Sequence, residues 1–97
     1  MNYIIFQWDE NKYHANQGKH KISFEEAETA FYDPQSIVID DPDHSKGEER
    51  FILIGLSAQA NLLVICHCYR ESETVVRIFS ARKATKRESK QYYHEEG

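Results

Sequence analysis

The stretch Val75-Val76-Arg77-Ile78-Phe79-Ser80-Ala81-Arg82-Lys83-Ala84-Thr85-Lys86-Arg87-Glu88 predicts a strand that runs almost directly into a helix. Its first half is rich in β-branched and aromatic residues, the composition of a strand. Thr85 followed by Glu88 forms a capping box, which marks the start of a helix. Two cations, Arg77 and Arg82, lie in or just beyond the strand. Because a cation there must face solvent or an anion, this stretch is the first place to look for a functional site.

The length and composition predict one domain spanning residues 1–97. Hydrophobic residues make up 40% of the chain and charged residues 29%, which is typical of a soluble globular protein. No apolar run approaches the ~20 residues that cross a bilayer, and the first residues do not have the pattern of a signal peptide. The sequence therefore predicts a cytoplasmic protein.

The cysteines and acidic residues give no signal for a metal or another cofactor. Cys66 and Cys68 are the only cysteines, and their i, i+2 spacing in a predicted strand rarely suits a disulfide. A second pair that would complete a zinc set is missing. His44 lies in an acidic loop without a recognised metal-ligand spacing. We therefore expect no metal and no cofactor.

Charge is distributed unevenly along the chain, although the net charge is −4. Residues 1–50 carry 5 basic and 11 acidic residues, whereas residues 51–97 carry 7 basic and 5 acidic residues. Between Arg77 and Lys90 there are six cations and a single acid, Glu88. A local basic surface attracts phosphate whatever the total charge, but the same run also fits the solvated face of an ordinary helix.

Periodicity and capping signals predict an α+β fold with an antiparallel four-stranded sheet, two N-terminal helices and a C-terminal helix. Asp9 and Ser23 are expected to cap the first two helices, and tight turns between the later strands favour an antiparallel meander. We expect the helices to cover one face of the sheet. The expected strands are 4–8, 36–40, 50–56, 62–70 and 74–80, of which three or four form the antiparallel meander, and the expected helices are 10–19, 24–32 and 86–93.

The register between the last two strands decides which side chains share a face. A three-residue turn over 71–73 pairs Arg70 with Thr74 and places His67 opposite Arg77. A turn shorter by one residue instead sets Cys66 or Cys68 opposite Arg77, and such a shift flips the partner face. We favour the first register, because it leaves no cation facing the core.

In the favoured register, His67, Tyr69 and Arg77 share an open face with the chemistry that RNA cleavage needs. Histidine transfers protons near neutral pH, arginine grips phosphate and stabilises developing charge, and an aromatic ring stacks on a base. A structural explanation remains open, in which His67 bonds a neighbour and Arg77 pairs with an acid. Lys19 and His20 form a second candidate cluster, although the helix dipole alone favours cations there.

Several segments in order resemble the BrnT toxin family: Phe6-Gln7-Trp8-Asp9-Glu10-Asn11-Lys12, Asn16-Gln17-Gly18-Lys19-His20, Ser23-Phe24-Glu25-Glu26-Ala27, Asp33-Pro34, Asp41-Pro42-Asp43-His44-Ser45, Gly47-Glu48-Glu49-Arg50-Phe51, Ile54-Gly55 and Ile78-Phe79-Ser80-Ala81-Arg82-Lys83-Ala84-Thr85. The resemblance covers nearly the whole chain. It implies a RelE-like fold and a ribonuclease toxin of a type II toxin–antitoxin system that inhibits translation by metal-independent cleavage of RNA.

The resemblance also implies partners and site residues. The expected partners are the RNA substrate and a ribbon-helix-helix antitoxin, with operator DNA bound only through the antitoxin, a possible heterotetramer, and no membrane. The expected catalytic residues are His67, Arg77, Arg82, Arg50 and Arg70, and the expected RNA-binding residues are Lys19, His20, Tyr69, Lys83 and Lys86. An alternative reading is a catalytically inactive toxin-like module that holds an antitoxin and modulates its repression.

Overall fold

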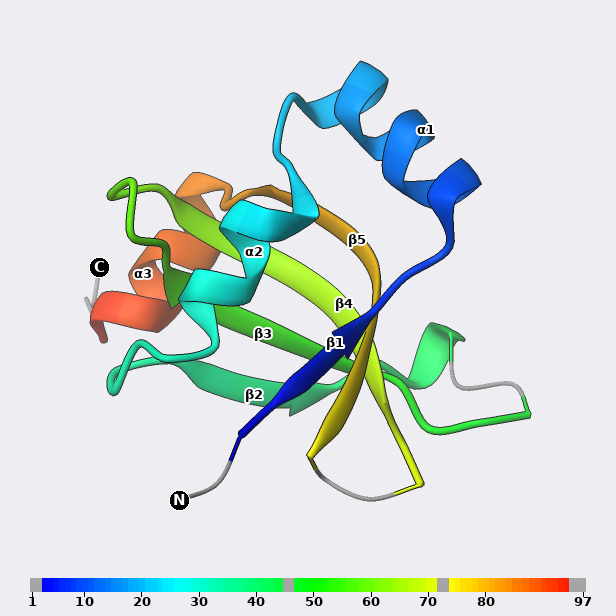
Figure 1. Ribbon diagram of the computed structural model, residues 1–97. Coiled ribbons are helices and arrows are strands. Elements are labelled where there is room, and N and C mark those ends of the chain that lie inside the picture. Colours follow the sequence, from blue (N-terminus) through cyan, green and yellow to red (C-terminus); the bar gives the residue numbers. More distant parts are fainter. Residues whose placement is uncertain (1–2, 45–46, 72–73, 95–97) are drawn as a thin grey trace.

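A computed structural model describes residues 3–44, 47–71 and 74–94 (Figure 1). The predicted α+β class is confirmed: three α-helices and a short 3₁₀ helix accompany one sheet in this part of the chain. The elements in order are β1 (Ile5–Gln7), α1 (Glu10–His20), α2 (Phe24–Ala30), β2 (Ile37–Asp40), η1 (Pro42–His44), β3 (Phe51–Leu56), β4 (Leu62–Arg70), β5 (Val75–Lys83) and α3 (Lys86–Tyr93).

The sheet has five described strands in the order β1-β5-β4-β3-β2. Strands β2 to β5 form the predicted antiparallel meander. The predicted count of four is wrong, because β1 adds a fifth strand that runs parallel to β5. Parallel neighbours need a long connection, and here most of the chain lies between the two strands.

The three predicted helix starts are confirmed. Asp9 accepts a hydrogen bond from the Lys12 backbone at 3.0 Å, and Ser23 caps α2 in the same way. At α3 the capping box is complete, because Thr85 accepts from the Glu88 backbone while Glu88 accepts from the Thr85 backbone. These caps fix where the strands give way to helices.

Helices cover both faces of the sheet, so the prediction that they lie on one face is wrong. On one face, hereafter the α2 face, Phe24 and Ala27 of α2 pack on a core that includes Leu63. On the other, the α3 face, Tyr92 of α3 packs on Ile54 and Val64. Leu63 and Val64 are neighbours in β4 and therefore point to opposite faces.

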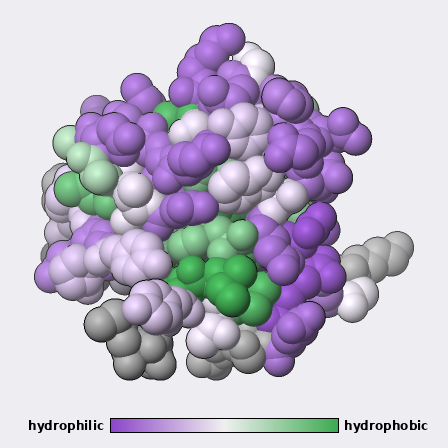
Figure 2. Space-filling view, viewed as in Figure 1, coloured by the Kyte–Doolittle hydropathy of each residue, from purple (hydrophilic) through white to green (hydrophobic). Residues whose placement is uncertain are grey.

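Part of the α2 face is left uncovered by helices. Figure 2 shows it as a hydrophobic patch bordered by hydrophilic residues. The patch includes a shallow groove of about 460 Å³. The groove is lined by Ile4, Phe31, Ser36, Val38, Phe51, Leu53, Tyr69 and Val76.

The favoured register between β4 and β5 is wrong, and β5 also contains a β-bulge. Cys66 pairs with Ser80 and His67 pairs with Ile78, so Phe79 is an extra residue without a partner in β4. Beyond the bulge, Cys68 lies opposite Arg77. The alternative register, with a cysteine opposite Arg77, is therefore the one found. Past the bulge the alternation of side chains is reversed, so that Ser80 lies on the same face as Arg77. Ser72 and Glu73 of the predicted turn lie outside the described residues.

The side chain of Asn16, which is only 6% exposed, joins helix α1 to the edge of β5. Its Nδ2 donates to the carbonyls of Ile22 at 3.0 Å and Ala81 at 2.9 Å, while the Ala81 N–H donates to its Oδ1 at 3.0 Å. Since β1 pairs with β5 only over residues 75–77, the Asn16 amide supplies the hydrogen bonds that a neighbouring strand would otherwise make.

Candidate functional site

All four arginines predicted as catalytic lie on the α3 face. Residues paired across antiparallel strands point the same way, so Arg77 opposite Cys68 shares a face with Ser80 opposite Cys66. Arg82 pairs with Val64, a residue of the α3-face core. Arg70 follows Cys68 by two positions in β4 and therefore shares its face. Arg50 directly precedes Phe51, which lines the groove on the α2 face, so Arg50 points to the opposite, α3 face.

Two of these arginines line a groove of about 420 Å³, hereafter the arginine groove. Arg50 and Arg82 provide its positive charge, and Asp41 and Asp43 provide acids. The complete lining is Asp41, Asp43, Arg50, Ile52, Val64, Cys66, Ser80 and Arg82. The groove therefore combines two guanidinium groups, two carboxylates and a hydroxyl on a floor of strand residues.

Arg82 is held in place by the cap of α3. Its two terminal nitrogens donate to the two carboxylate oxygens of Glu88, at 2.7 and 2.8 Å. The hydrogen bonds from Arg82 lower the pKa of Glu88 to about 2, although partial burial opposes the shift. A bidentate pair fixes the guanidinium plane, so the capping box also orients an arginine of the groove.

Arg50 is held by an aromatic ring and approached by an acid. Its guanidinium carbon lies 3.9 Å from the centroid of the Phe79 ring, a close cation–π stack. Glu48 lies 4.0 Å from Arg50 and 3.4 Å from Arg70. Because these ion pairs are partly exposed, they contribute little stability and leave the positive charge accessible to an anion.

The cysteines are not activated nucleophiles. Burial, with a smaller contribution from Asp41, raises the pKa of the Cys66 thiol to about 11. Its Sγ donates to Asp41 at 3.6 Å. Burial also raises the pKa of the Cys68 thiol. Both side chains are therefore neutral at physiological pH, in line with the sequence-based view of them as structural residues.

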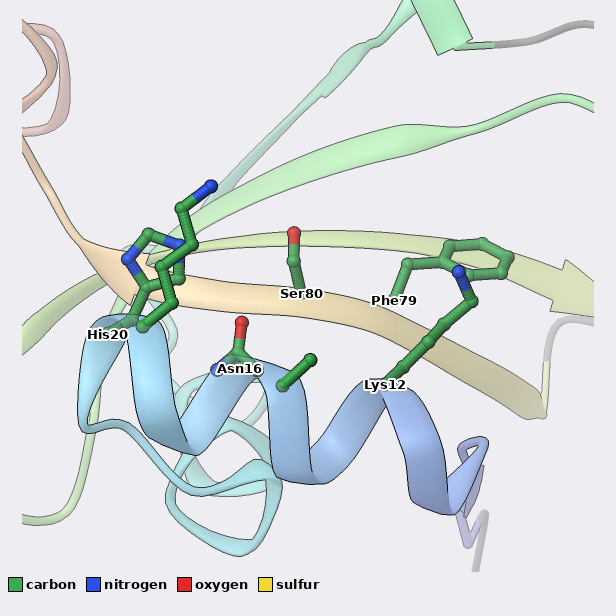
Figure 3. A pocket seen from close by; sticks show the side chains of 7 residues that line it. Lys12, Asn16, His20, Phe79 and Ser80 are labelled. Carbon is green, nitrogen blue, oxygen red and sulfur yellow. The ribbon is translucent and has the colours of Figure 1, made fainter.

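A second groove, of about 210 Å³, lies between α1 and β5 and is hereafter the α1 groove. It is lined by Lys12, Ala15, Asn16, Lys19, His20, Phe79 and Ser80. Figure 3 shows Lys12 beside the Phe79 ring at one end, His20 at the other, and Ser80 and Asn16 between them. Ser80 also lines the arginine groove, so the two grooves adjoin along β5 and bring together the Lys19–His20 cluster with Arg50 and Arg82.

His67 and Tyr69 lie on the opposite face of the sheet, so the prediction that they share an open face with Arg77 is wrong. His67 is 0% exposed. It contacts the rings of Phe31, Phe51 and Tyr69. Its Nδ1 donates to the Ile65 carbonyl at 3.1 Å, and its Nε2 has no hydrogen-bond partner in the described structure. Burial lowers the pKa of the imidazole, so His67 is a neutral core residue.

The remaining predicted RNA-binding residues lie away from both grooves. Lys83 and Lys86 are exposed where β5 gives way to α3, and neither lines either groove. Tyr69 is 37% exposed at the edge of the hydrophobic patch. None of these three side chains lines either groove.

Sequence reasoning missed three residues of the grooves: Lys12, Phe79 and Ser80. Lys12 is one of several exposed lysines, and only its position two turns before Lys19 connects it with that cluster. Phe79 has the composition expected of a buried strand residue. Regular alternation along a strand would place Ser80 on the face opposite to Arg77. The bulge places Phe79 and Ser80 on the same face. It could not be predicted from these residues, since neither is a glycine, the residue that often marks a bulge.

The cations of the two adjoining grooves are of the kinds that bind a polyanion, and Asp41 and Asp43 lie beside them in the arginine groove. Guanidinium groups bind phosphate in bidentate fashion, lysines add point charges, and His20 adds an imidazole to the α1 groove. Over residues 3–44, 47–71 and 74–94, no three His, Cys, Asp or Glu side chains gather as a metal site requires. None of the helices in these segments is long and apolar enough to span a bilayer.

Comparisons with known proteins identify a family and a similar fold. The model of a family described as the ribonuclease toxin BrnT of type II toxin–antitoxin systems matches residues 8–88. A similar solved structure is that of the Brucella abortus ribonuclease toxin BrnT, with a TM-score of 0.62 and 20% sequence identity over 89% of this chain and 100% of that one. At this identity the likeness shows a shared fold. The curated proteins gave no match.

Proposed function

The chain belongs to the BrnT family of ribonuclease toxins of type II toxin–antitoxin systems, and we propose that it cuts RNA without a metal ion, by attack of a ribose 2′-hydroxyl on the adjacent phosphate. The observation that carries this proposal is the gathering of arginines on the α3 face beside the α1 groove. An RNA strand lying along β5 passes both grooves, because they share Ser80. The reaction leaves a 2′,3′-cyclic phosphate and a free 5′-hydroxyl.

The arginines stabilise the charge that builds up on the phosphate. As the 2′-oxygen attacks, negative charge grows on the non-bridging oxygens, and fixed cations lower the barrier most when they need no rearrangement. Glu88 holds Arg82 in a bidentate pair and Phe79 holds Arg50 in a stack. Arg77 adds a cation farther along the same face.

His20 is the group we assign to proton transfer. It lies at the end of α1 and lines the α1 groove together with Ser80. Removing the 2′-proton and protonating the leaving 5′-oxygen both need a side chain that changes protonation state near neutral pH. His67 cannot take this role, because it is buried on the α2 face.

The wider biology follows from the family. We propose that cleavage of RNA in the cytoplasm inhibits translation, and that a small ribbon-helix-helix antitoxin neutralises the protein. In this proposal the antitoxin contacts operator DNA, and the two proteins form a heterotetramer. The uncovered hydrophobic patch on the α2 face leaves room for protein contacts away from the grooves.

The test is RNA cleavage by purified protein with excess chelator, comparing Arg50→Gln with Arg87→Gln. Arg50 lines the arginine groove, whereas Arg87 is an exposed cation of α3 that lines neither groove, so Arg87→Gln is a control of equal charge. Arg50 is preferred to Arg82, whose loss would also disturb the α3 cap. We expect wild type and Arg87→Gln to produce cyclic phosphate ends, and Arg50→Gln to be slower by roughly 10²-fold.

Three results would contradict the proposal. Cleavage that stops on chelation would exclude the metal-independent mechanism. Equal loss of activity in both variants would show that general charge matters rather than the position of Arg50 in the arginine groove. A folded wild-type protein that neither cleaves RNA nor arrests growth would favour the alternative of an inactive module that holds an antitoxin.

A further inference from the structure

Phe79 is an aromatic residue at the centre of a basic surface. It is the extra residue of the β5 bulge, and its half-buried ring lines the α1 groove beside Ser80. Regular strand geometry places residues 79 and 80 on opposite faces, whereas a bulge lets both point to one side. The bulge therefore adds an aromatic surface to a face that is otherwise built for phosphate.

Two cations lie over the Phe79 ring, at very different distances from its centroid. The Arg50 guanidinium lies 3.9 Å from the ring centroid, which is close stacking. The Lys12 ammonium lies at 6.0 Å, the outer limit of a cation–π contact, on an exposed side chain. Figure 3 shows the Lys12 ammonium beside the ring. Displacing Lys12 costs little, whereas the stack with Arg50 is strong enough to persist.

We propose that the Phe79 ring is a stacking platform for one nucleobase of the bound RNA, which takes the place of Lys12 over the ring. The inference rests on the proposed function, because it assigns a base subsite within the same RNA-binding surface. Base–aromatic stacking tolerates any base, since every base has a π-face. The displaced Lys12 remains close enough to pair with a flanking phosphate.

The surroundings of the ring fit a strand of RNA. Lys12 and Lys19 are seven residues apart on α1, a rise of about 10 Å, so the groove has cations at both ends. Ser80 and Asn16 lie between them. A single strand bound here places phosphates at the cations and turns one base toward Phe79, the combination found where proteins bind single strands.

The test measures binding of a short single-stranded RNA that is 2′-O-methylated and therefore cannot be cleaved. Wild type is compared with Phe79→Leu, which removes the π-system, and with Phe79→Trp, which restores one. The control is Phe6→Leu, because Phe6 is a partly buried aromatic residue that packs against the core of the α2 face. Circular dichroism confirms that each variant is folded. Each binding curve is repeated over a range of salt, and with a single abasic site moved along the RNA.

We expect Phe79→Leu to weaken binding roughly tenfold, the effect of losing one base–aromatic stack. Phe79→Trp and Phe6→Leu should bind as wild type does. The salt dependence should not change in Phe79→Leu, because no phosphate contact is lost, whereas Lys12→Gln should reduce its slope by about 0.7. An abasic site at one position should weaken wild type but not Phe79→Leu.

Two outcomes would overturn the subsite while leaving the proposed function intact. One is RNA binding by Phe79→Leu equal to wild type. The other is a weaker binding with a reduced salt slope and no abasic effect, which would mean that Phe79 acts only by holding Arg50 against phosphate. Failure of the wild-type protein to bind or cleave any RNA would instead overturn the proposed function and the subsite together.

Discussion

Replacing Asn16 with alanine should destabilise the protein far more than an exposed substitution on the same helix. The Asn16 amide makes three hydrogen bonds in a nearly solvent-free position, joining α1 to the Ala81 backbone in β5 and to the Ile22 carbonyl. Alanine removes all three and leaves one backbone N–H and two carbonyls without these partners.

The size of the effect follows from that count. A buried polar group left unsatisfied costs about 1–3 kcal/mol, and the better helix propensity of alanine returns about 0.5 kcal/mol. The free energy of unfolding should fall by about 3 kcal/mol, a large share of the roughly 5–15 kcal/mol that holds a domain together. The melting temperature should fall by roughly 10–20 °C.

Urea unfolding followed by circular dichroism measures the change, with Asn11→Ala as the control. Asn11 is an exposed residue of α1, and its replacement should change stability by less than about 0.5 kcal/mol. Asn16→Asp adds a check on the mechanism, because the new carboxylate would face two carbonyls. Its pKa should be raised in the folded state, so this variant should be more stable at low pH and lose stability as the pH rises.

An Asn16→Ala variant within about 0.5 kcal/mol of wild type would refute the reasoning. It would mean that water satisfies the edge of β5 once the amide is gone, so that α1 is held by other contacts. A large loss of stability in Asn11→Ala as well would point to the helix itself rather than to its attachment.

Two further predictions concern titration. Burial lowers the pKa of His67 in the folded state, so its neutral form contributes stability above about pH 6.5, and this stability is lost as the pH falls from there through the lowered pKa. The urea midpoint of His67→Leu should therefore drop less between neutral and acidic pH than that of wild type. An equal drop in the two proteins would contradict the view that His67 is buried in its neutral form. The pKa of Glu88 is lowered to about 2, so its pairing with Arg82 stabilises the fold above about pH 4.5 and is lost toward pH 2. Glu88→Gln should lower the free energy of unfolding by about 1–2 kcal/mol at pH 7 and by almost nothing near pH 2. A loss of stability that does not depend on pH would show that Glu88 acts only through the helix cap.

The parts of the fold that depend on local signals could be predicted from the sequence. Asp9, Ser23 and Thr85 cap their helices as expected, because a cap needs only residues a few positions apart. The four arginines chosen from the sequence share the α3 face in the structure, and their role stays a prediction. However, they share this face in the register with Cys68 opposite Arg77, which the sequence analysis considered but did not favour.

The errors concern interactions between distant segments. The parallel pairing of β1 with β5 joins the two ends of the chain, and no local pattern indicates it. His67 was expected opposite Arg77 because Arg70 was paired with Thr74 at the turn between β4 and β5. In the structure Cys68 is opposite Arg77 instead, and His67 lies among Phe31, Phe51 and Tyr69. Asn16 resembles any polar helix residue until its amide is seen against Ala81.

The bulge at Phe79 also bears on how this strand can change length. Pairing between β4 and β5 is regular on both sides of that residue, so deleting Phe79 would leave each remaining pair in register and each remaining side chain on its present face. In evolutionary terms, Phe79 has the properties of a one-residue insertion that adds an aromatic ring to the surface without disturbing the core. A one-residue gap at this position in an alignment is therefore compatible with an unchanged fold.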